Sequence, residues 1–162
     1  IIDEIYDSTD VNHDGLKEFI FSWEKKKLSD GDTIFVSFYK QRVTGEYQHF
    51  KTLSNLFPIN LESYSLSYRF KDKKIEDIQS RYNGMYPLSD LEIRGRDIKL
   101  SIKCAVGESY NLHYEFDTKI NNWILVKCEK LTELLDEKTI EPVDLTGKKL
   151  LIDDFNYFDY MY

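Results

Sequence analysis

Alternation of apolar and polar residues over positions 98–104 and 110–116 is the feature that most constrains the fold of this chain. Successive side chains of a β-strand point to opposite faces, so alternation predicts strands with one buried face. Turn residues, Gly107 and the pair Asn121-Asn122, separate the alternating segments. The pattern predicts a three-stranded antiparallel meander over residues 98–104, 110–116 and 123–128.

The first third of the chain is also predicted to form β-strands joined by turns. We expect strands at residues 1–9, 19–23, 33–39 and 47–53, joined by a loop, a turn at Asp30-Gly31-Asp32 and a hairpin at Gly45. The 12 Tyr and 10 Phe residues favour strands over helices. We therefore predict an all-β fold, or a β-rich fold with one short helix, built as a single propeller-like or sandwich-like domain of antiparallel meanders.

The rest of the chain carries weaker signals. A strand is expected at 63–70, a short helix at 71–80, a short strand at 91–93, a helical turn within 131–141 and a last strand at 149–152. The tail 153–162 is expected as an edge strand or a free peptide. The expected division of the domain is 1–53 (ion loop and first meander), 54–82 (insertion), 83–130 (second meander) and 131–162 (C-terminal strand and tail).

The two cysteines, Cys104 and Cys128, fall at the same end of the meander. The middle strand should separate them by two strand steps of about 4.8 Å each. That separation exceeds the limit of roughly 7 Å between the Cα atoms of a disulfide. Free thiols are the favoured interpretation, and a curled sheet is the alternative that would allow a bond.

The strongest functional signal lies before the second expected strand, at residues 10–18. Oxygen-bearing side chains occupy the first, third, fifth and ninth places, and Gly15 occupies the sixth, where the chain must turn. Calcium takes six to eight oxygen ligands from a tightly curled loop. The predicted ligands are Asp10, Asn12, Asp14, the Leu16 carbonyl and Glu18.

The loop differs from an EF-hand, because the twelfth place holds Phe21 and not a glutamate. The alternative to an ion site is a turn stabilised by Asp and Asn side chains, with Asp14-Gly15 at its tip. Four oxygen ligands exceed what a turn needs, so we predict bound Ca²⁺. Magnesium fits less well because it prefers few protein ligands and several waters.

A series of short segments follows the 10–18 loop in a fixed order: 83–87, 91–93, 98–102, 107–110, 114–117 and 122–125. Together they resemble a bacterial family of small proteins related to FG-GAP and VCBS repeats. In that family a loop like 10–18 comes first, then a glycine-aromatic turn, a strand, a hairpin and a closing strand with Trp. The likeness covers about residues 5–53 and 83–130. The chain departs from the family at Glu18, where Asp is usual, and at Asn83 and Glu108.

The resemblance implies a non-enzymatic, calcium-containing β protein of the periplasm, the cell envelope or the secreted fraction. Related proteins include lysozyme-inhibitor-like immunity proteins, so it implies a protein partner such as a secreted hydrolase or toxin. Inhibitors of this type present a loop with Ser and Tyr, and Gly107, Ser109 and Tyr110 form a comparable segment. The alternative for that segment is an ordinary hairpin turn.

No arrangement of residues points to catalysis. The three histidines are scattered, and no His or Cys spacing suits zinc. His113 shares a strand face with Glu115, and Cys104 should face the other way. We therefore expect no catalytic residues.

Charge and composition narrow the partners and the compartment. The net charge of −7 argues against nucleic acid and is compatible with a basic protein partner. No apolar run is long enough to cross a bilayer. The chain begins with Ile1 and not with Met, so we expect that a leader or a tag has been removed.

Two functions remain open from the sequence. The first is a calcium-stabilised domain that binds a protein, which the tyrosine content favours. The second is a structural or carbohydrate-contacting envelope domain whose calcium only stabilises the fold. Aromatic side chains in a groove would favour sugar, and a flat or protruding aromatic patch would favour protein.

Overall fold

The computed structural model describes residues 2–25, 33–56, 89–105, 107–134 and 137–160. Within these ranges the chain forms two antiparallel sheets, each with its strands in sequence order. The expected strand at 63–70 and helix at 71–80 lie outside the described residues. The all-β fold built from antiparallel meanders is confirmed.

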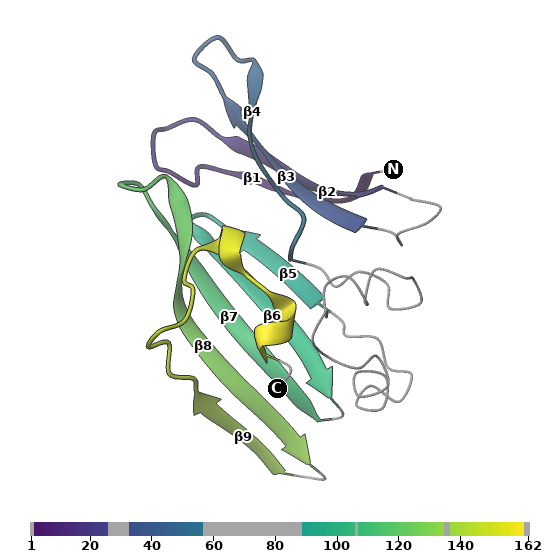
Figure 1. The fold of residues 1–162 in the computed structure, drawn as a ribbon. Helices are drawn as coiled ribbons and strands as arrows, with labels where there is room; N and C mark the ends of the chain where they lie inside the picture. Colours follow the sequence, from purple (N-terminus) through teal and green to yellow (C-terminus); the bar gives the residue numbers. More distant parts are fainter. Residues whose placement is uncertain (1, 26–32, 57–88, 106, 135–136, 161–162) are drawn as a thin grey trace.

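The first sheet has the order β1-β2-β3-β4, and neighbouring strands are antiparallel (Figure 1). The described strand boundaries agree with the predicted strands to within a few residues. The period-two pattern therefore located this sheet well. The strands are β1 (Ile2–Thr9), β2 (Glu18–Lys25), β3 (Thr33–Gln41) and β4 (Tyr47–Leu53).

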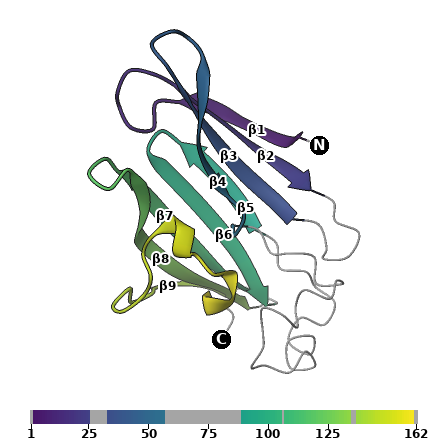
Figure 2. The ribbon, with the colours of Figure 1, turned by 45° about the horizontal axis from the view of Figure 1, so that its top comes forward.

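The second sheet has the order β5-β6-β7-β8-β9 and contains the predicted meander as its three central strands. Figure 2 shows the second sheet beside the first, with β5 as its strand nearest to the first sheet. The strands are β5 (Ser89–Arg94), β6 (Asp97–Ala105), β7 (Glu108–Asp117), β8 (Asn122–Leu134) and β9 (Glu137–Pro142).

The helical turn predicted within 131–141 is wrong. These residues extend β8 and form β9, with Leu131 paired to Ile140 and Thr132 paired to Thr139. Glu133 and Lys138 add an ion pair of 2.8 Å across the hairpin. Every residue of β9 is exposed. Because this strand has no buried face, its sequence does not alternate between apolar and polar residues.

One hydrophobic core joins the two sheets. Phe38 of β3 packs on Trp123 of β8 with ring centroids 4.7 Å apart, and Phe116 of β7 lies 4.8 Å from the same indole ring. Trp123 and Phe38 are fully buried. Since residues of both sheets share this core, the chain folds as a single domain.

The C-terminal segment covers the core and forms neither an edge strand nor a free peptide. Leu151 makes one isolated bridge with Ile124, where a last strand was expected at 149–152. Two short 3₁₀ helices follow, η1 (Ile152–Asp154) and η2 (Tyr157–Tyr160), and they lie over the second sheet in Figures 1 and 2. Ile152, Phe155 and Tyr160 are buried there.

The strand order bears on the cysteines. β7 lies between β6, which contains Cys104, and β8, which contains Cys128. Cys128 is a free, buried thiol whose pKa is raised to about 11 by burial. The side chain of Cys104 lies outside the described part of the molecule. No helix in the described residues combines the length and apolar character needed to span a membrane.

Candidate cation site

The loop between β1 and β2 curls tightly around the carboxylate of Asp10. His13 and Gly15 adopt positive φ angles of 60° and 82°, which turn the chain back on itself. Asp10 Oδ1 accepts a hydrogen bond from the Asp14 amide at 3.1 Å, and its Oδ2 accepts one from the Gly15 amide at 2.9 Å. The glycine predicted as the turn residue therefore stands at one of the two positions that require this backbone.

Two further side chains stabilise the same turn. Asn12 Oδ1 accepts from the Asp14 amide at 3.0 Å, and Asp14 Oδ1 accepts from the Leu16 amide at 3.0 Å. These bonds are what a turn without metal would show. An ionised carboxylate has about four acceptor sites, so each bonded oxygen keeps capacity for a cation.

Glu18 is the predicted ligand whose burial the hydrogen bonds of the turn do not explain. It lies at the start of β2 with only 2% of its surface exposed. Its Oε2 accepts a hydrogen bond from the Val11 amide at 2.7 Å. Its Oε1 is buried and has no hydrogen-bond partner among the described residues.

Burial raises the pKa of the Glu18 carboxyl, and the hydrogen bond from Val11 only partly offsets this. Nearby Asp14 and Asp10 act in the same direction as burial. A buried carboxylate without a partner is costly, so such a group takes up a proton or attracts a cation. The charge of Lys40 acts the other way and lowers this pKa, but Glu18 Oε1 has no hydrogen-bond partner among the described residues and so keeps a position for a proton or a cation.

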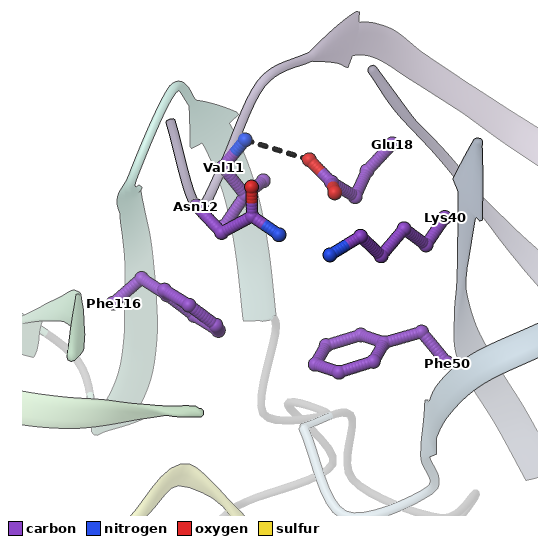
Figure 3. Close-up of a pocket in the computed structure, with 6 residues that line it drawn as sticks. All are labelled: Val11, Asn12, Glu18, Lys40, Phe50 and Phe116. Atoms are coloured by element: carbon purple, nitrogen blue, oxygen red, sulfur yellow. Dashed lines mark hydrogen bonds between the residues drawn. The ribbon is translucent and has the colours of Figure 1, made fainter. Parts of the chain in front are cut away.

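A small cavity of about 10 Å³ lies beside this carboxyl. Figure 3 shows Glu18, Asn12 and Lys40 extending toward one another, with Phe50 and Phe116 on the core side. A volume of this size holds about one water molecule. The loop thus has room for a small bound species next to the Glu18 carboxyl.

Lys40, from β3, was not predicted as part of the site. Its Nζ lies 2.6 Å from Asp14 Oδ2, and this hydrogen bond lowers the pKa of Asp14. Lys40 comes from a different strand, and only the register that pairs Lys40 with Glu18 reveals it. Its ammonium group partly balances the negative charge of the loop.

The predicted ligands form one loop but do not converge on one point. Asp10, Asp14 and Glu18 do not have ligand atoms within 4.8 Å of one another, a spacing that a different cluster among the described residues does meet. A bound ion would require Asp14 to exchange Lys40 for the ion. The oxygen chemistry of the loop and the unpartnered Glu18 Oε1 fit a hard cation such as Ca²⁺.

The predicted partner-binding segment forms the hairpin between β6 and β7. Gly107 turns the chain with φ of 73°, and its carbonyl accepts a hydrogen bond from the Glu133 amide at 2.6 Å. Tyr110 is partly buried against the core, with its ring 5.5 Å from that of Tyr160. Ser109 is half-buried on β7. Binding of a partner at this hairpin stays a prediction.

A separate row of aromatic side chains lies on the face of the first sheet that points away from the core. Phe21 stacks on Tyr39 at 5.7 Å, and Trp23 stacks on Phe35 at 4.4 Å. Alternation places these rings opposite the core residues Ile20, Val36 and Phe38. We call this set the outer aromatic face. It consists of Phe19, Phe21, Trp23, Phe35, Tyr39, Tyr47 and His49.

Hydrogen bonds fix the centre of the outer aromatic face. Trp23 Nε1 donates to Ser37 Oγ at 2.9 Å, Ser37 Oγ lies 2.9 Å from Thr52 Oγ1, and Thr52 Oγ1 lies 2.9 Å from His49 Nε2. The indole N–H is thereby satisfied without solvent. The face presents partly buried and exposed rings on three strands, β2, β3 and β4.

Comparisons with protein-family models, with characterised proteins and with solved structures give no match to this chain.

Proposed function

We propose that this chain is a non-enzymatic β domain whose 10–18 loop binds Ca²⁺ and whose outer aromatic face binds a protein. The observation that carries the ion proposal is the buried Glu18 Oε1, which has no partner among the described residues. Asp10, Asn12 and Asp14 supply further oxygens within one short arc. The resemblance to FG-GAP and VCBS-related proteins supports the same assignment.

Calcium is favoured over magnesium because of the ligand set. The loop offers several side-chain oxygens, and Ca²⁺ accepts such ligands in irregular geometry. Mg²⁺ instead keeps several waters in an octahedral shell. Weak calcium sites of about 10⁻⁴ to 10⁻³ M work outside cells, where the ion is abundant. The proposal therefore includes a periplasmic, envelope or secreted location.

Thermal unfolding with calcium, with magnesium and with chelator tests the ion site. With free calcium at about a hundred times its dissociation constant, we expect roughly 2.7 kcal/mol of added stability. Asp10→Ala and Asp14→Ala should remove this gain. Asp144→Ala is the matched control, because Asp144 Oδ1 also accepts a backbone bond, from Thr146 at 2.9 Å, in a turn outside the loop.

The outcome against the ion proposal is clear. If Asp10→Ala and Asp14→Ala lower the melting temperature equally with calcium and with chelator, the loop is a turn and no more. An identical response of the wild-type chain to calcium and magnesium would also contradict a calcium site.

A protein is the favoured partner because the outer aromatic face gathers Phe, Tyr and Trp side chains on one side of the sheet. These residue types are enriched at protein interfaces. The net charge of −7 favours a basic partner. A secreted hydrolase or toxin, neutralised by an immunity protein, is the class that the resemblance suggests.

The partner proposal is tested by binding of candidate basic hydrolases to the wild-type chain and to Tyr39→Ser. Loss of binding in Tyr39→Ser, with binding retained in Ile140→Ser, would support the aromatic face, since Ile140 is an exposed apolar residue of β9. Retention of binding in Tyr39→Ser and its loss in Tyr110→Ser would move the interface to the β6–β7 hairpin. Binding of oligosaccharides instead would support the envelope-domain alternative.

A further inference from the structure

A second group of potential ligands lies on the second sheet, away from the 10–18 loop. Asp97, His113 and Glu115 each place a ligand atom within 4.8 Å of the other two. Alternation puts them on the face opposite the core residues Ile98 and Tyr114. Alternation in the sequence places His113 and Glu115 on one face, and the strand register brings Asp97 beside them.

Two adjacent strands hold this group in place. Asp97 of β6 is paired directly with Glu115 of β7, and His113 lies two residues before Glu115 on the same face. His113 Nε2 is 2.9 Å from Asp97 Oδ1. The three backbone positions are fixed by the sheet, so the side chains need only small rotations to converge.

The charges around the group are unbalanced. Two carboxylates face each other across the strand pair, an arrangement that destabilises a sheet unless a cation lies between them. His113 is the only ion-pair partner of Asp97 among the described residues, and Glu115 has none there.

The neighbouring lysines do not compensate. Lys127 pairs with Glu129 at 2.9 Å, and Lys99 lies 4.0 Å from Glu92. Both ammonium groups are therefore engaged away from Asp97 and Glu115. An ordinary surface ion pair explains the contact between Asp97 and His113. It does not explain why Glu115, a second carboxylate, lies directly opposite Asp97.

We propose that Asp97, His113 and Glu115 bind a divalent transition-metal ion, with Zn²⁺ as the representative. One imidazole and two carboxylates suit Zn²⁺, and three protein ligands leave a position for water or another molecule. Zinc bonds of about 2.0–2.2 Å bring ligand atoms closer together than 4.8 Å, so the required movement is small. Calcium is disfavoured because it takes oxygen ligands only.

The proposed ion has a path from solvent. An open hollow of about 540 Å³ lies on the same face, and His113, Lys99 and Lys127 are among its lining residues. The side chain of Asp97 is 44% exposed, and Glu115 is exposed. This site differs from the 10–18 loop in position, in ligand chemistry and in the ion that it selects.

Isothermal titration of the calcium-saturated chain with Zn²⁺ tests the proposal. We expect saturable binding to one site, with the affinity lowered at least about tenfold in His113→Gln and in Glu115→Gln. His49→Gln is the matched histidine control, since His49 lies on the first sheet, and Asp117→Asn is the matched carboxylate control at the end of β7. Both controls should bind Zn²⁺ as the wild-type chain does.

A nuclear magnetic resonance titration separates the two sites. Zn²⁺ should shift the His113 imidazole signals in the wild-type chain and equally in Asp10→Ala, in which the proposed calcium response is expected to be lost. The proposal would be overturned if His113→Gln bound Zn²⁺ as tightly as the wild-type chain. It would also be overturned if His49→Gln and His113→Gln lost equal Zn²⁺ affinity, or if calcium displaced Zn²⁺. Melting curves of the metal-free variants show that each one is folded.

Discussion

At the scale of single residues, the buried carboxyl of Glu18 makes stability depend on pH. Burial raises its pKa above the ordinary value of 4.5, so the folded chain binds more protons than the unfolded chain. With chelator, we expect this group's contribution to the free energy of unfolding to fall as pH rises from about 4.5 through the raised pKa. Glu18→Gln should flatten that part of the profile.

Urea unfolding at a series of pH values, with and without calcium, measures this effect. Calcium favours the ionised carboxylate and should therefore oppose the fall in the wild-type chain but not in Glu18→Gln. Superimposable pH profiles for the two chains in chelator would show that the Glu18 carboxyl does not titrate as its burial implies.

Lys40 is expected to compete with the ion for Asp14. Both partners of this pair are more than one-third exposed, so the pair contributes about 0–1 kcal/mol. Lys40→Met should therefore change the stability in chelator little and raise the calcium affinity by up to about fivefold. Calcium titration followed by thermal unfolding gives both quantities. Unchanged calcium affinity would show that Lys40 and the ion do not share Asp14.

The sequence predicted the loop residues because their spacing is local. Asp10, Asn12, Asp14 and Glu18 lie within nine positions, and the structure places all of them in one turn region. Lys40 was missed because it reaches the loop only through the pairing of β2 with β3. The lack of a partner for Glu18 Oε1 depends on packing, which no spacing rule contains.

At the scale of elements, the β6–β7 hairpin depends on Gly107. A Cβ atom there would lie 2.2 Å from the Glu133 carbonyl oxygen, and the φ of 73° is unfavourable for any other residue. The left-handed backbone alone costs roughly 1–2 kcal/mol, so we expect Gly107→Ala to destabilise by more than about 2 kcal/mol. Denaturant unfolding measures the loss.

Gly45 is the matched control for that prediction. Its φ is 87°, but a Cβ atom there would have nothing within 4 Å. Gly45→Ala should therefore show the backbone term alone, about 1–2 kcal/mol. Equal losses in the two variants would mean that β8 moves away from the hairpin at little cost.

The elements predicted from period-two alternation were found because each has one buried and one exposed face. β8 and β9 escaped prediction beyond Cys128 because neither face of that ribbon is buried. Pairing with a neighbouring strand, which a local pattern does not record, decided the structure.

At the scale of the whole molecule, Asn55 fastens the C-terminal segment to the first sheet. Its Nδ2 donates to the carbonyl oxygens of Ile152 at 3.0 Å, Asp153 at 3.2 Å and Phe155 at 2.9 Å. Asn55→Ala would remove these bonds, including the one to the partly buried Phe155 carbonyl, at a cost of about 1–3 kcal/mol. Limited proteolysis should then cut the segment 143–160 faster than in the wild-type chain.

Asn111→Ala is the control, because the side chain of Asn111 accepts an exposed hydrogen bond, from Ser101 at 2.8 Å. Its proteolysis rate should match that of the wild-type chain. If Asn55→Ala is cut no faster than Asn111→Ala, apolar burial of Ile152, Phe155 and Tyr160 holds the segment without the amide.

The C-terminal segment also determines when during synthesis the chain can complete its fold. Lys51 bonds to Asp153 across 102 positions of the chain, and Asn55 reaches Ile152 across 97. At about 5–20 residues per second, Lys51 and Asn55 wait roughly 5–20 seconds on the ribosome for these bonding partners to be synthesised. Chains stalled at residue 142 lack this segment and should accordingly be more sensitive to protease than released chains. A newly made copy therefore spends its first seconds with the part of the core that Ile152, Phe155 and Tyr160 later cover open to chaperones and to other nascent chains.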